Sequence, residues 1–92
     1  MNNKQNIAPS LGGTYYADQF NITTNVDKLL GEVKCGNGFE WLEGNYIGTD
    51  AINLADYQNL PALSKIWDKQ AFKVYFKIGD RGDNTWKTFT GA

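Results

Sequence analysis

Residues 71–78 of the chain, AFKVYFKI, decide the fold because their side chains change character at every second position. The set that shares one side of an extended chain consists of Phe72, Val74, Phe76 and Ile78. The set on the other side consists of Lys73, Tyr75 and Lys77. A period of two predicts a β-strand. A longer helical stripe also fits the region, but the density of Val, Tyr, Phe and Ile favours a sheet.

Glycine-rich turns lie between β-rich segments at two places, and each predicts a hairpin. Residues 79–84, GDRGDN, join the strand above to residues 85–90. Residues 36–38, GNG, join residues 29–35 to residues 39–42 in the same way. Tight turns need residues that accept positive φ, and glycine and asparagine do so.

The remaining segments complete the predicted fold. Alternation predicts a further strand near 19–24, and helical spacing after Pro61 predicts a short helix at 61–70. Residues 1–13 lack a periodic apolar face and are expected to form a flexible N-terminal arm. The predicted class is therefore α+β, mostly β. We expect a small antiparallel sheet of two hairpins with one short helix, in a single β-rich domain at 14–92.

Composition excludes several classes of function. The 92 residues contain no histidine and one cysteine, Cys35. The chain therefore lacks the usual general base, and it can form neither a disulfide framework nor a common zinc site. Acids such as Glu40 and Glu43 fall on opposite faces of a strand, so they do not form the carboxylate pair of a glycosidase. We expect no enzyme, no metal and no cofactor.

Charge is divided unevenly along the chain. Residues 1–64 carry three lysines and seven acids, a net charge of −4, while residues 65–92 carry six basic residues and three acids, a net charge of +3. This asymmetry suits an anionic partner, a head-to-tail contact between copies, or two halves that neutralise each other within one fold. The overall pI of about 5.2 argues against a nucleic acid as the partner.

No targeting segment is visible in the sequence. The polar amino terminus lacks the apolar run of a signal peptide, and no stretch approaches the ~20 apolar residues of a membrane span. We expect a soluble protein without a membrane partner, and the compartment stays open.

The loop at residues 80–84, DRGDN, admits three interpretations. It contains an Arg-Gly-Asp tripeptide of the cell-adhesion type, and its oxygen-rich side chains suggest a calcium loop. It lacks, however, the alternating acids and the terminal glutamate of an EF-hand loop. The third interpretation, which we favour, is a charged hairpin tip whose Asp, Gly and Asn residues supply turn geometry.

Surplus aromatic residues suggest a function that depends on surfaces. Three Trp, five Tyr and five Phe exceed what so small a core obviously needs, so some are expected to face outward. The alternative is that a small β-rich domain uses these large rings to gain buried area in its core. The candidate interaction surface combines aromatic and basic residues, namely Tyr15, Tyr16, Trp41, Lys73, Tyr75, Lys77, Arg81 and Trp86.

These features predict a non-catalytic assembly or interaction protein. The favoured hypothesis is a small structural subunit of a phage virion, such as a capsid-decorating protein, which contacts copies of itself or a larger assembly. The virion or the host cytoplasm is then its location. The alternatives are a small carbohydrate- or ligand-binding module that uses exposed aromatic rings, and a compact inhibitor of a host enzyme.

Overall fold

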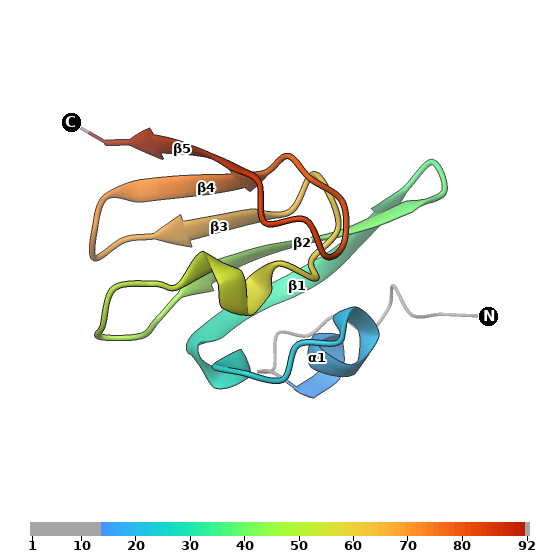
Figure 1. Ribbon diagram of the computed structural model, residues 1–92, viewed down its shortest axis with the longest axis horizontal. Coiled ribbons are helices and arrows are strands. Elements are labelled where there is room, and N and C mark those ends of the chain that lie inside the picture. The colour runs from blue at the N-terminus through green and yellow to red at the C-terminus, as the bar shows by residue number, and fades with distance from the viewer. Residues whose placement is uncertain (1–13, 92) are drawn as a thin grey trace.

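The structure is a computed structural model that describes residues 14–91 of the chain, with side chains from residue 17 onward. The strands follow one another across one sheet in the order β1 (Leu29–Gly36), β2 (Phe39–Tyr46), β3 (Lys65–Asp68), β4 (Lys73–Lys77) and β5 (Trp86–Thr90). Neighbouring strands are antiparallel except β2 and β3, which are parallel (Figure 1). The predicted antiparallel arrangement is therefore wrong at this pair, and the sheet is mixed, because β2 and β3 are joined by the long connection through η3 (Leu54–Tyr57) and not by a hairpin. The mostly β class is confirmed. The arm predicted at 1–13 lies outside the described residues.

Both predicted hairpins are present. In the first, Gly36 pairs with Phe39 and leaves a two-residue turn in which Asn37 has a φ of 52° and Gly38 a φ of 83°. Two positive φ values match the twist of the flanking strands, which explains the choice of Asn and Gly there. The second hairpin joins β4 to β5 through the predicted turn.

The strand predicted near 19–24 is wrong, because the helix α1 (Thr14–Phe20) occupies the start of this segment. Asn21, with a φ of 59°, ends the helix in the left-handed conformation. The Ile22 N–H then donates to the carbonyl oxygen of Ala17 at 2.9 Å. Phe20 and Ile22 are both buried, so the alternation reflects a helix end rather than a strand.

The helix predicted at 61–70 is also wrong. Leu63 has a φ of 80°, which a helix does not allow, and residues 65–68 form β3. Ser64 and Lys77 hold this segment to β4, since the Lys77 N–H donates to the Ser64 carbonyl oxygen at 2.8 Å. Because β3 pairs with β2 on one side and β4 on the other, pairing across the sheet overrides the local helical spacing.

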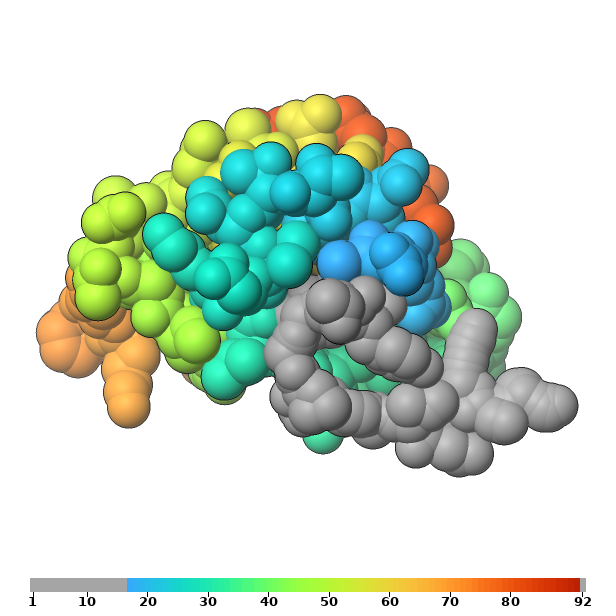
Figure 2. All heavy atoms as spheres, turned by 90° about the horizontal axis from the view of Figure 1, so that it is seen from below, coloured from blue at the N-terminus to red at the C-terminus, as the bar shows by residue number. Residues whose placement is uncertain are grey.

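One face of the sheet is covered and holds the core. The covering layer contains α1, the 3-10 turn η2 (Val26–Lys28) and the 3-10 turn η3 (Leu54–Tyr57). Figure 2 shows residues that follow α1, in blue to teal, beside the connection between β2 and η3, in yellow-green. The buried apolar side chains are Ala17, Phe20, Ile22, Leu29, Leu42, Tyr46, Tyr57, Leu60, Ile66 and Tyr75.

Candidate functional site

The other face of the sheet, which we call the open face, is the candidate functional site. Strand register places its side chains in two cross-strand rows. One row contains Leu30, Asn45, Trp67, Val74 and Phe89, and the other contains Glu32, Glu43, Lys65, Phe76 and Lys87. None of these ten side chains is buried. Large apolar groups therefore stand on a sheet face that the core does not use.

The sequence predicted the alternation in β4 correctly, but the expectation that its Lys73–Tyr75–Lys77 side forms a surface is wrong. Tyr75 and Lys77 are 7% and 2% exposed on the covered face. Phe72 and Ile78, from the apolar set, are 68% and 57% exposed. The covering layer packs against the side of β4 that looks polar in sequence. This is possible because the Tyr75 hydroxyl and the Lys77 ammonium both have hydrogen-bond partners on that side.

Lys77 is buried because its ammonium group finds three acceptors. Its Nζ donates to the carbonyl oxygens of Gly79 at 2.9 Å, Asp80 at 2.9 Å and Asp83 at 2.6 Å. The ammonium also lies 5.6 Å from the ring centre of Trp86. Burial lowers the pKa of Lys77 below 10.5, and the carboxylates of Asp83 and Asp80 partly oppose this shift.

Tyr75 is buried beside an acidic side chain. Its hydroxyl lies 3.5 Å from Oδ2 of Asp68, which is itself only 4% exposed. Burial raises the pKa of Tyr75 above 10.0, and the Asp68 carboxylate adds to the rise. Neither group is available for contact with a partner.

The Lys77 ammonium also explains why the carbonyl oxygens of the loop after β4 converge on one point. It takes the carbonyl oxygens that a bound cation would use, so the structure gives no support to the calcium interpretation. The Arg81 guanidinium lies 5.0 Å from the ring centre of Phe20, so the Arg-Gly-Asp arginine packs on α1. Gly82 has a φ of 87°, and its N–H donates to the Gln58 carbonyl oxygen at 2.9 Å. The predicted turn geometry is therefore confirmed.

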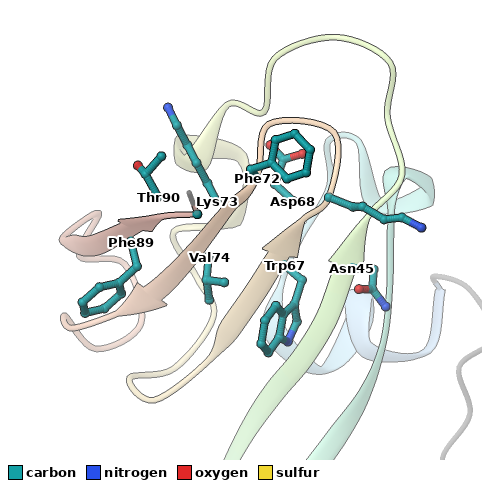
Figure 3. Close-up of a pocket in the computed structure, with 10 residues that line it drawn as sticks. Asn45, Trp67, Asp68, Phe72, Lys73, Val74, Phe89 and Thr90 are labelled. Carbon is teal, nitrogen blue, oxygen red and sulfur yellow. The ribbon is translucent and has the colours of Figure 1, made fainter.

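A shallow hollow of about 420 Å³ lies on the open face near the β3–β4 turn. Figure 3 shows Trp67, Val74 and Phe89 projecting to the same side of the sheet, with the Phe72 ring at the turn. Trp67 and Phe89 are 48% and 50% exposed. The walls of this hollow are therefore mainly aromatic and aliphatic.

A second hollow, of about 540 Å³, lies farther along the same face. Its apolar lining residues are Trp41, Leu63, Phe76, Ile78 and Phe89. The rings of Phe76 and Phe89 meet edge to face, with centres 5.3 Å apart. Since Phe89 lines both hollows, they form one continuous apolar surface.

Charge on the open face differs between its two ends. The acids Glu32 and Glu43 lie on β1 and β2, where Glu32 pairs with Lys34 at 2.9 Å and its carboxylate raises the Lys34 pKa. At the open-face positions of β3, β4 and β5, all of which are described, the charged residues are Lys65 and Lys87. The β3–β5 end is therefore positive.

The residues predicted as a single interaction surface lie in different places. Trp41 lies on the open face, whereas Lys73 and Trp86 lie half-buried on the other face. Arg81 lies in the turn, and the side chains of Tyr15 and Tyr16 lie outside the described part of the chain.

Sequence reasoning missed Trp67, Phe72, Val74, Phe76 and Phe89 as surface residues. The period of two placed Phe72, Val74 and Phe76 on one side of a strand, but that pattern does not say which side is covered.

No helix within residues 14–91 has the length and apolar character needed to cross a membrane. No group of three or more Cys, Asp or Glu side chains among them is arranged to hold a metal ion. Comparisons of the chain with protein-family models, with curated proteins and with solved structures found no match.

Proposed function

We propose that this chain is a non-catalytic interaction subunit that binds a partner protein through the open face. The observation that carries the proposal is the exposure of Trp67, Phe72 and Phe89, which are 48%, 68% and 50% accessible on one continuous surface. Soluble chains rarely expose contiguous apolar patches without a partner to cover them. Aromatic residues at the centre of such a patch commonly supply most of the binding energy.

The charge of the open face indicates the chemistry of the partner. Lys65 and Lys87 lie on its β3–β5 end, and Lys69 lines the first hollow. A partner that inserts an apolar side chain between Trp67 and Phe89, with carboxylates beside these lysines, matches both properties. Such a chain serves as a component of a protein assembly, and the virion setting stays a prediction from the sequence.

The carbohydrate-binding alternative suits the open face less well. Trp67 has polar neighbours in Asn45 and Glu43, which a sugar ring can use. Most of the first hollow, however, is lined by apolar groups such as Phe72, Val74 and Phe89. A sugar needs several directed polar contacts, so this lining favours a protein side chain.

Photochemical cross-linking in the producing cells tests the proposal. Phe72 is replaced by p-benzoylphenylalanine, which keeps an aromatic ring at an exposed position of the hollow. We expect a discrete adduct with a second protein, weakened about tenfold by the additional change Trp67→Ala. The same photoreactive residue at Asp27, exposed in η2 on the covering layer, serves as the control and is expected to give no such adduct.

Two results contradict this function. One is an equal set of adducts from positions 72 and 27. The other is the absence of protein adducts together with quenching of tryptophan fluorescence by soluble glycans that Trp67→Ala abolishes. The second result assigns the open face to carbohydrate instead.

A further inference from the structure

The free edge of β5 presents main-chain groups that the described residues leave unpaired. The Ile78 N–H donates to the Thr85 carbonyl oxygen at 2.9 Å, and the Gly91 N–H donates to the Phe72 carbonyl oxygen at 2.6 Å. Since an antiparallel ladder alternates, residues 87 and 89 also direct their main-chain groups toward β4. The N–H and carbonyl groups of Trp86, Thr88 and Thr90 therefore point away from the sheet.

The sequence of β5 does little to prevent this edge from pairing with another chain. Natural edge strands commonly carry proline, a bulge or several charges that prevent pairing with another chain. The five residues of β5, WKTFT, contain neither proline nor glycine, and Lys87 is their single charge. Figure 1 shows β5 at the outer border of the sheet, with no labelled element beyond it.

We propose that a second copy of this chain pairs with β5 through its own β5, antiparallel and around a twofold axis at Thr88. In this register Thr88 lies opposite Thr88 of the other copy, and Trp86 lies opposite Thr90. These are the three residues whose main-chain groups point outward, so the hydrogen-bond pattern continues across the axis. Lys87 of each copy lies opposite Phe89, where its ammonium can contact the ring.

Neighbouring registers that keep the same hydrogen-bond pattern are less favourable. A shift of two residues in one direction places Lys87 opposite Lys87 of the other copy, and like charges directly opposite are destabilising. A shift in the other direction removes Trp86 from the paired region. The charge and length of β5 therefore select the register centred on Thr88.

This pairing has a consequence for the open face. A twofold axis at Thr88 stands perpendicular to the sheet, so the open faces of both copies lie on the same side of one ten-stranded sheet. The hollows that Phe89 lines in each copy become neighbours across the axis. The dimer therefore presents two copies of the proposed binding surface side by side, which raises its avidity for a repeated partner.

Light scattering coupled to size-exclusion chromatography tests the pairing across a wide range of protein concentration. We expect the mass of the wild-type chain to rise with concentration from 10.3 kDa to twice that value and no further. Thr88→Pro removes an outward N–H but no hydrogen bond to β4, so it is expected to abolish the dimer. Thr88→Val keeps the N–H and the shape, and is the matched control that still dimerises.

A cysteine cross-link tests the register and does not require Thr88→Pro to fold. In the proposed dimer the two Thr88 Cα atoms lie about 5.5 Å apart, within the range of a disulfide. With Cys35 replaced by serine, Thr88→Cys is expected to give a covalent dimer on mild oxidation. Thr90→Cys is the control, because its two copies lie four residues apart along the strand, about 13 Å.

Three results overturn the pairing: a monomer at every concentration, a mass that grows beyond two chains, or equal cross-linking at positions 88 and 90. The proposed function does not depend on these results. Trp67→Ala lies away from the β5 edge and is expected to leave the dimer intact while it weakens the adduct from position 72.

Discussion

Replacement of Lys77 by methionine is expected to lower the free energy of unfolding by about 3 kcal/mol. The lysine is 2% exposed, and its ammonium donates to three carbonyl oxygens of the following loop, those of Gly79, Asp80 and Asp83. Methionine has a similar length but no donor, so all three acceptors lose their partner while the apolar stem stays packed. Urea denaturation monitored by tryptophan fluorescence measures the change.

Lys73→Met is the matched control for this prediction. Lys73 lies on the same face of the same strand but is half-buried, and its side chain makes no hydrogen bond or ion pair within the described residues. Its replacement is expected to change the free energy of unfolding by less than about 0.5 kcal/mol. If both variants lose the same free energy of unfolding, the hydrogen bonds of the Lys77 ammonium do not stabilise the fold as proposed. Amide exchange at Gly79 and Asp83 is expected to rise only in Lys77→Met, because their N–H bonds close this loop.

The elements that sequence predicts correctly depend on local chemistry. The hairpin from β1 to β2 follows from Asn37 and Gly38, whose positive φ values satisfy the turn without help from distant residues. The strand β4 follows from the alternation at residues 73–77. A tight turn and an alternating strand both depend on residues that are neighbours in the chain, so the sequence alone is sufficient to predict them.

The elements that the sequence does not predict depend on residues far away along the chain. β3 forms because β2 and β4 supply partners on both sides, although residues 61–70 have helical spacing. The burial of Lys77 depends on a loop that folds back to offer its carbonyl oxygens, which no spacing reveals. The open face was missed for the same reason, since the side of β4 that is covered depends on α1, η2 and η3.

Substitution of Gly31 by alanine is expected to cost about 3 kcal/mol of stability. Gly31 of β1 lies directly opposite Gly44 of β2. A Cβ atom at position 31 would lie 2.6 Å from the Glu43 carbonyl oxygen and 2.7 Å from the Gly44 Cα atom. Both are main-chain atoms of a central strand, so β1 itself must move to relieve the overlap.

Movement of β1 is costly because the strand also supplies the core. Leu29 is fully buried, so displacing the strand away from β2 opens space around it. Gly36→Ala in the same hairpin is the control, since a Cβ atom there meets the Trp41 ring at 3.6 Å, an ordinary contact. Thermal and urea denaturation of both variants measures the difference. Equal stability of Gly31→Ala and Gly36→Ala would mean that β1 can shift freely at the edge, and that the close approach of the two glycines does not hold this end of the sheet together.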